Sequence, residues 1–139
     1  MSVMDLDIVK FCALECARQQ SGEFSVYNMC MAYQYAKEKK GMCGNPSVNI
    51  ISSLGFLVDP VNAGGFRTTP VTINYQQIPV IDFDRSLTAY CEAWGKMPPE
   101  TRYREFEIIH PFVDGNGRVG AILYNWNHMT YPKTPPKFY

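Results

Sequence analysis

The sequence has 139 residues, of which 46% are hydrophobic and 19% are charged. This composition indicates one folded domain with a single core and excludes a disordered chain. Thirteen basic and thirteen acidic side chains balance, so the chain lacks the positive charge that nonspecific nucleic-acid binding normally requires.

The cysteines and the N-terminal segment indicate the cellular compartment in which the protein is expected. Five cysteines, an odd number, contain no C-x-x-C pair, so neither a metal site nor a disulfide framework is indicated. Asp5 and Asp7 interrupt the N-terminal segment, and no apolar run reaches the length of a signal peptide or a membrane span. We therefore expect a cytoplasmic protein with no membrane partner.

Two helices are predicted at the start of the chain. Apolar residues at helical spacing predict the first over residues 5–19, and residues 21–23 interrupt it. Ser25 can cap the second helix, which should end at Lys40, before Gly41.

The middle of the chain changes in character. A third helix is predicted over residues 45–54, with Asn45 as its cap and Gly55 after it. Prolines and glycines between residues 56 and 81 exclude a long helix there. The alternating residues 70–75 predict a short β-hairpin or flap.

The second half again has helical patterns. A cap at Asp82 or Asp84 predicts a helix that ends before Gly95. The helix after Pro98 should end at His110, because the next residue is a proline, which disfavours helical geometry in the residue before it.

The last helix and the tail complete the expected fold. Gly117 and Arg118 should begin a buried helix, since residues 119–126 are almost entirely apolar. Residues 132–139 contain three prolines and are expected to be extended or loose. The predicted fold class is all-α: one mostly helical domain over residues 1–139, with a short β-hairpin flap.

The run Gly115-Asn116-Gly117-Arg118 has the features of an anion site. Two glycines that flank an asparagine at a helix start let backbone N–H groups converge on one point, with no Cβ in the way. Arg118 can add a forked contact to phosphate oxygens. The run therefore predicts a phosphate-binding loop.

Two neighbours of this loop add chemistry. Asp114 would repel phosphates unless a cation lay between them, so it is a candidate Mg²⁺ ligand. His110 lies at the mouth of the loop, and a neutral imidazole is a suitable general base for a hydroxyl. Taken singly, such residues are more often a turn, a structural histidine or a surface arginine; it is their combination that favours a site.

The run from His110 to Arg118, HPFVDGNGR, resembles the signature of the Fic (filamentation induced by cAMP) or Fido family, usually written H-P-F-x-[DE]-G-N-G-R-x-x-R. Residues 64–71 resemble the family segment G-x-[FY]-R-x-x-x-V, which forms a flap beside the target peptide, and Ile78-Pro79 resembles the stretch that follows it. The resemblance covers residues 64–132, with 133–139 as a tail, and it implies the Fic-like helical fold.

The resemblance also implies a reaction: Mg²⁺-dependent transfer of a nucleoside monophosphate, AMP from ATP or the equivalent from another nucleoside triphosphate, to a Ser, Thr or Tyr hydroxyl of a target protein. His110 would be the base and Asp114 the Mg²⁺ ligand. Phe112 would be buried and anchor the loop. The nucleotide phosphates would be bound by Gly115, Asn116, Gly117 and Arg118, with Asn116 contacting a phosphate oxygen and Arg118 the distal phosphates.

The flap would supply the contacts to the target peptide, through Arg67, Thr68, Thr69 and Val71. Arg67 could either face the site or decorate the surface of the flap, and the sequence does not separate these two interpretations.

The sequence departs from the family at Ala121, where the signature has its second arginine. Three alternatives follow: nucleotidyl transfer that is weaker or uses another nucleotide, phosphate transfer as in the death-on-curing toxin branch, or a binding module without turnover. That branch has Ala-Asn-Lys in place of Gly-Asn-Gly, which ranks phosphate transfer second. If the family's logic holds, Ala121→Arg should raise nucleotidyl transfer.

The family's inhibitory pattern, Ser/Thr-x-x-x-Glu-Gly/Asn, is absent from the sequence. Any inhibitor would therefore be a separate protein. The other implied partners are a nucleotide and a target protein. A short standalone domain of this kind would suit a toxin or an effector that acts inside a host cell.

Overall fold

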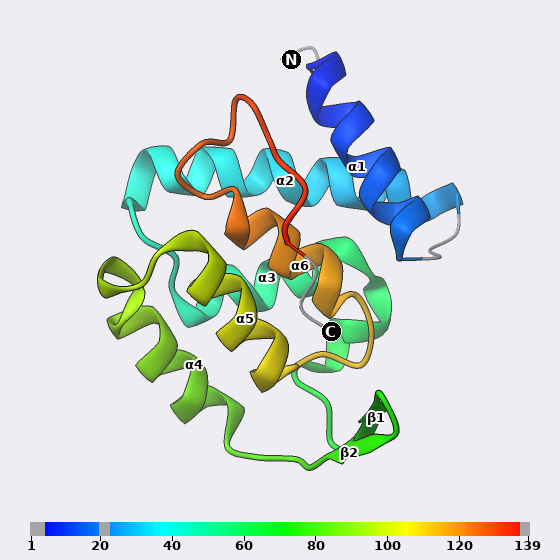
Figure 1. Ribbon diagram of the computed structural model, residues 1–139, viewed down its shortest axis with the longest axis vertical. Helices are drawn as coiled ribbons and strands as arrows, with labels where there is room; N and C mark the ends of the chain where they lie inside the picture. Colours follow the sequence, from blue (N-terminus) through cyan, green and yellow to red (C-terminus); the bar gives the residue numbers. More distant parts are fainter. Residues whose placement is uncertain (1–4, 20–22, 137–139) are drawn as a thin grey trace.

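The computed structural model describes residues 5–19 and 23–136, which form six α-helices and one β-hairpin (Figure 1). This confirms the expected mostly helical fold with a small hairpin. The elements are α1 (Leu6–Arg18), α2 (Glu23–Cys43), α3 (Val48–Val58), β1 (Val71–Ile73), β2 (Gln76–Ile78), α4 (Phe83–Glu92), α5 (Pro99–Ile109) and α6 (Asn116–Tyr124), with short 3₁₀ helices η1 (Pro60–Gly64) and η2 (Trp94–Lys96).

Helix α6 is the centre of the fold. It contacts α1, α2, α3 and α5, which surround it in Figure 1. Its residues 119–123 are all buried, which explains why this stretch is apolar on every side. Within α6 only Gly117 in the first turn and Tyr124 at the end are partly exposed, and the other residues are buried.

The first two helices match the prediction in existence but not in every boundary. Asp5 caps α1 by accepting a hydrogen bond from the Asp7 N–H. Of the predicted break at 21–23, residues 21 and 22 lie outside the described residues, and Glu23 begins α2. Ser25 therefore lies inside α2 and does not cap it.

The C-terminus of α2 was also placed too early. The helix continues through Gly41 to Cys43, and Gly44, with φ of 80°, takes up the left-handed conformation that ends it. Gly41, Met42 and Cys43 are exposed, and hydrogen bonds hold this end of the helix: the Gly44 N–H donates to the Lys40 carbonyl at 3.0 Å, and the Gly44 carbonyl accepts a hydrogen bond from Trp126 Nε1 at 2.7 Å.

Helix α3 begins and ends later than predicted. Its cap is Ser47, whose hydroxyl accepts a hydrogen bond from the Ile50 N–H, and not Asn45. The helix runs past Gly55 to Val58. Gly55 is a packing residue: a Cβ there would overlap the ring of Phe112. The glycine that looked like a helix terminator instead lets another segment approach.

The predicted hairpin is present, and its first strand covers only residues 71–73 of the alternating segment 70–75. Val71 pairs with Ile78 and Ile73 with Gln76, so the turn consists of Asn74 and Tyr75 alone. Both have positive φ, 50° and 65°, as two-residue hairpin turns of this kind require. Figure 1 shows the hairpin extending from the helical body.

The helices that flank the motif begin and end close to the predicted residues. Asp82, not Asp84, caps α4 by accepting a hydrogen bond from the Arg85 N–H. Helix α5 ends at Ile109 with His110 as its cap residue, which confirms the position expected for His110. Helix α6 begins at Asn116, one residue before the expected start.

The segment after α6 is not loose where the structure describes it. Residues 132–136 have no helix or strand, yet the Asn125 side chain accepts a hydrogen bond from the Lys133 N–H at 2.6 Å and donates one to its carbonyl at 2.8 Å. Pro135 is buried. Residues 137–139 lie outside the described residues. Across the described chain, none of the helices is both long enough and apolar enough to cross a membrane.

Candidate active site

A cleft of about 660 Å³ opens at the motif loop, defined as residues 110–118. It is formed by the end of α1, one face of α5, the motif loop with the first turn of α6, and the tail segment. The residues that line it are Arg18, Gln19, Tyr103, Glu107, His110, Val113, Asp114, Gly115, Asn116, Gly117, Arg118, Thr134 and Pro135. The structure thus places all six predicted motif residues on one cavity.

His110 is held in an uncommon backbone conformation. Its φ and ψ of 49° and 60° are left-handed, which costs a non-glycine residue roughly 1–2 kcal/mol. Its N–H donates to the Phe106 carbonyl at 3.0 Å, and its carbonyl accepts a hydrogen bond from Arg67 Nε at 2.6 Å. These contacts turn the chain sharply at the end of α5 and direct the ring to the cleft wall.

The His110 ring is suited to remain neutral. Burial lowers its pKa below the ordinary value, and the positive charge of Arg67 acts in the same direction. The Glu107 carbonyl and the Asp114 carboxylate oppose the shift but do not cancel it. Nδ1 is buried without a hydrogen bond of ordinary geometry in the described structure, so Nε2 is the nitrogen left to meet a ligand.

Asn116 closes the loop with its side chain. Its Oδ1 accepts a hydrogen bond from the Phe112 N–H and its Nδ2 donates to the Phe112 carbonyl, both at 2.9 Å. Both polar atoms of the side-chain amide are already used, so the predicted contact between Asn116 and a phosphate oxygen would have to come from the backbone. Only the backbone N–H of Asn116 remains for a ligand.

Phe112 is buried, as predicted, and anchors the loop. Its ring packs against Phe66 and Phe106, with ring centroids 5.7 and 6.4 Å away, and against the bare face of Gly55. The loop is thus fixed to α3 and α5 from the side opposite the cleft.

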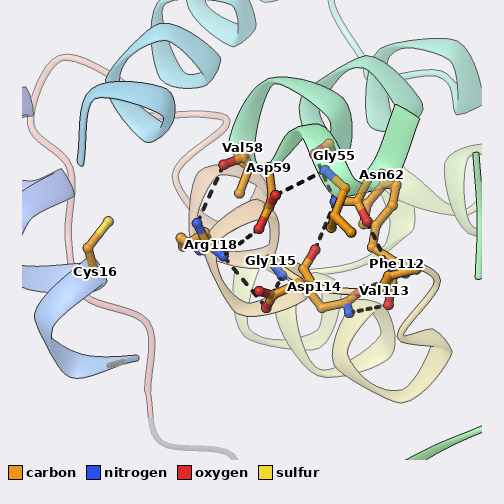
Figure 2. A network of polar contacts seen from close by, with 12 residues as sticks. Cys16, Gly55, Val58, Asp59, Asn62, Phe112, Val113, Asp114, Gly115 and Arg118 are labelled. Atoms are coloured by element: carbon orange, nitrogen blue, oxygen red, sulfur yellow. Dashed lines mark hydrogen bonds and ion pairs between the residues drawn. The ribbon is translucent and has the colours of Figure 1, made fainter. Parts of the chain in front are cut away.

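Asn62 is a residue that sequence reasoning missed. From η1 it donates hydrogen bonds to the carbonyls of Gly55 and Asp114, both at 2.9 Å, and accepts one from the Val113 N–H at 3.1 Å (Figure 2). It is buried and bridges α3 to the motif loop. No sequence pattern marks it, because its partners are backbone groups distant in the chain.

The first turn of α6 supplies the anion cradle. The N–H groups of Asn116, Gly117 and Arg118 precede the first intrahelical bond, which Val119 makes to the Gly115 carbonyl. Gly115 has φ of 84°, and a Cβ there would also lie 2.7 Å from Val58 Cγ1. The geometry fits the converging amides and the positive helix end that the glycines predicted.

Arg118 lies between two carboxylates. Its side chain is 4% exposed, with Nη2 3.6 Å from Asp114 Oδ1 and 3.9 Å from Asp59 Oδ2, while Nη1 donates to the Val58 carbonyl at 3.4 Å. Figure 2 shows these contacts converging on the guanidinium. Arg118 is therefore oriented by the protein, and much of its charge is balanced before any ligand arrives.

Asp114 is the carboxylate that faces solvent. Its side chain is 66% exposed, and Oδ1 accepts a hydrogen bond from the Gly115 N–H at 2.7 Å. In the described residues no three His, Cys, Asp or Glu side chains gather as a metal site. One carboxylate at a phosphate cradle suits Mg²⁺, which commonly takes one or two protein carboxylates together with substrate phosphates and water.

Comparison with known proteins identifies the segment that contains this site. The profile of the Fic/DOC family matches residues 101–127, which comprise most of α5, the motif loop and α6. Over residues 101–127, about a fifth of the chain, the sequence is therefore similar to the Fic/DOC family.

A similar protein is a probable protein adenylyltransferase of Aquifex aeolicus (strain VF5), 80% identical over 20 residues. The match covers 14% of this chain and 6% of the relative, so the chain shares only a short stretch with that protein.

Arg67 lies upstream of the Fic/DOC segment. The sequence left open whether it faces the site or decorates the surface of the flap, and the structure shows neither position. It is 2% exposed, and its guanidinium donates to the carbonyls of His110, Thr69, Ile78 and Pro79. It also lies over the ring of Phe83. Arg67 neither faces the cleft nor decorates the flap; it fastens the base of the hairpin to the motif loop.

The other flap residues keep their expected role as a prediction. Thr68 and Thr69 are exposed and Val71 is half-buried, and none of the three lines the cleft. They lie where the hairpin leaves the helical body.

Ala121 is fully buried in the core of the Fic/DOC segment, with 0% exposure. An arginine there would have to displace packed neighbours and bring a charge into an apolar region. The structure therefore opposes the expectation that Ala121→Arg would raise nucleotidyl transfer. Loss of stability is the expected result.

Proposed function

We propose that this protein transfers a nucleoside monophosphate, AMP from ATP, to a Ser, Thr or Tyr hydroxyl of a target protein in a Mg²⁺-dependent reaction. The observation that carries the proposal is that one cleft is lined by a histidine whose pKa is lowered by burial, by the N-terminal turn of α6 and by an oriented arginine. The name of the Aquifex aeolicus relative, a probable protein adenylyltransferase, supports AMP as the transferred group.

The phosphate end of the cleft would bind the nucleotide. The amides of Asn116, Gly117 and Arg118 would donate to phosphate oxygens, and the helix dipole would favour their negative charge. The exposed Asp114 carboxylate would hold Mg²⁺, which when bound supplies positive charge to the phosphates. Since Arg118 is already fixed by Val58 and two carboxylates, it would meet the ligand without losing much side-chain freedom.

The other end of the cleft would activate the target. Nε2 of His110 would take the proton from the target hydroxyl as its oxygen bonds to the α-phosphorus of ATP. The bond from that phosphorus to the bridging oxygen of the β-phosphate would break, and pyrophosphate would leave with the electron pair. The lowered pKa of His110 suits this role, because the ring is neutral before the reaction begins.

A direct test is to incubate the protein with Mg²⁺ and each nucleoside triphosphate in a cell lysate, then measure the intact masses of modified proteins. The proposal expects an added nucleoside monophosphate that disappears with His110→Ala. Asp114→Ala should weaken the dependence on Mg²⁺ more than it weakens phosphate binding without metal. Nucleotide binding with no mass added to any protein would identify a binding module instead.

Phosphate transfer is the second candidate. The observation that favours it is the absence of a second arginine on α6, where Ala121 is buried in the core. A lone added phosphate in the same mass measurement would select it over nucleotidyl transfer.

A further inference from the structure

Arg18 lies on the same cleft as Arg118, although the two are far apart in the sequence. Arg18 is in the last turn of α1, and its side chain is 37% exposed. The next residue, Gln19, lies so close to α6 that a Cβ on Gly117 would overlap its carboxamide. The end of α1 is therefore placed beside the first turn of α6, where the amide cradle is.

The Arg18 side chain is held by a buried carboxylate. Its Nε and Nη2 donate to Glu15 Oε2 at 3.2 and 2.6 Å, and Gln19 Nε2 donates to the same oxygen at 3.0 Å. The Glu15 side chain is 1% exposed. Burial lowers the pKa of Arg18, but hydrogen bonds to Glu15 and Tyr103 outweigh it and raise the pKa overall. The guanidinium is thus both charged and positioned.

The cleft needs a second cation to balance the negative charge of a bound triphosphate. Arg118 already faces Asp59 and Asp114, so its charge is shared before a nucleotide binds. A triphosphate brings several negative charges to the same amides. Helix α6 has no further cation to offer, since Ala121 occupies the position one turn after Arg118 and is buried. Arg18 has five N–H donors, and the bonds to Glu15 and Tyr103 use only some of them.

We propose that Arg18 is a second phosphate ligand of the cleft, which supplies from α1 a guanidinium for the terminal phosphates of a nucleoside triphosphate. This inference rests on the proposed function, because it assumes that the cleft binds such a nucleotide. Arg18 would then determine the preference for a triphosphate over a monophosphate, while the amides of α6 bind the phosphate that both share.

The test is calorimetric titration of the purified protein with ATP and with AMP, each with Mg²⁺. Arg18→Gln should weaken ATP binding about tenfold or more, the scale of a charge-assisted hydrogen bond of about 1.5–3 kcal/mol, and leave AMP binding nearly unchanged. Arg18→Lys keeps the charge without the fork and should restore part of the difference. Lys10→Gln removes the same charge from an exposed position of α1 and is the matched control, expected to change neither affinity.

Each outcome decides the proposal. Equal weakening of ATP and AMP would show that Arg18 only supports the local structure, and tighter binding after Arg18→Gln would show that the end of α1 obstructs the cleft; either result overturns the inference and leaves the proposed function standing. Failure of the unaltered protein to bind either nucleotide would overturn both. Should Arg18→Gln unfold because Glu15 loses its partner, the ratio of ATP to AMP affinity in Arg18→Lys decides, since a purely structural role leaves that ratio unchanged.

Discussion

The motif loop and the β1–β2 hairpin are joined at His110, but they are stabilised in opposite ways. In the loop, side chains from η1 and α6 satisfy backbone groups, and Phe112 fills a site made by Gly55 of α3. Beyond its base, the hairpin is exposed from Asn74 to Gln77 and rests on a two-residue turn. The fold therefore fixes the groups expected to do chemistry and leaves the groups expected to meet a protein partner adaptable.

The largest effect is expected at the loop, from His110→Ala. The variant should still fold and bind nucleotide, because the amide cradle is built by residues 115–118. Transfer should fall by about two to four orders of magnitude, the usual scale for losing a general base. The measurement is the rate of label transfer to a target at saturating nucleotide. A His110→Ala protein with the unaltered rate would remove His110 from the mechanism and most of the case for an enzyme.

Asn116→Ala should destroy the loop while leaving its chemical groups present. It removes two buried hydrogen bonds and leaves the N–H and carbonyl of Phe112 without their partner. The free energy of unfolding should fall by about 2–3 kcal/mol, measured by denaturant titration. Asn127→Ala, at an exposed position after α6, is the control and should change it by no more than about 0.5 kcal/mol. Equal small effects of both variants would contradict the importance given to the Asn116 amide.

Arg67→Lys tests the junction between the two regions. Lysine keeps the charge, but it cannot reach the four carbonyls that the Arg67 fork contacts or cover the Phe83 ring equally well. The expected loss of stability is about 1–2 kcal/mol, with the hairpin amides losing protection from hydrogen exchange before the helices do. Uniform loss of protection across α5 and the hairpin would show that Arg67 serves the whole fold and not this junction.

The pH dependence of transfer should come from His110 in the motif loop and not from the hairpin. Burial lowers the pKa of His110, so the native ring stays neutral as the pH falls through the ordinary histidine value of about 6.5. Transfer should therefore persist below that value and then decrease about tenfold per pH unit once the pH is below the lowered pKa. The unfolded chain binds the proton first, so the contribution of His110 to stability also decreases as the pH falls from the ordinary value to the lowered one.

The measurement for this prediction is a pH profile of the transfer rate at saturating nucleotide. Residues 71–78 contain no side chain that titrates near neutral pH, so substitutions in the hairpin should scale the profile without moving its acidic limb. An acidic limb centred at or above the ordinary histidine value would contradict the lowered pKa.

The contrast between the two regions also explains which features of the structure could be predicted from the sequence. The end of α5 at His110 was predictable because Pro111 restricts the residue before it, and the cradle was predictable because glycines at a helix start have few other uses. These are local rules. Gly41 and Gly55 gave the wrong helix boundaries for tertiary reasons: Trp126 bonds to the Gly44 carbonyl and so holds the chain beyond Gly41, and Gly55 makes room for Phe112.

Residues that serve distant backbone groups were the least predictable. Asn62 bridges α3 to the motif loop, and Arg67 joins the hairpin to His110, but neither partner set can be deduced from spacing in the chain. The prediction for Asn116 named no atom, and the sequence could not show that the side-chain amide closes the loop, which leaves the backbone N–H for a phosphate. A motif therefore predicts which residues share a site better than it predicts which atoms are free.

The smallest effect is expected at the hairpin turn, from Tyr75→Gly, and its sign should be opposite to the others. Tyr75 has φ of 65° and is 102% exposed, so it bears left-handed strain without any packing in return. Glycine removes a strain of roughly 1–2 kcal/mol and loses roughly 0.5–1 kcal/mol through the greater freedom of the unfolded chain. The net gain should be at most about 1.5 kcal/mol, measured as a small rise in Tm. Asn74→Gly should gain less, because asparagine tolerates this conformation.

If the exposed ring contacts the target protein, Tyr75→Gly should also slow transfer to that target while nucleotide binding stays unchanged. A stabilised variant with an unaltered rate would confine Tyr75 to the turn, and a destabilised one would mean that the ring packs against the protein after all.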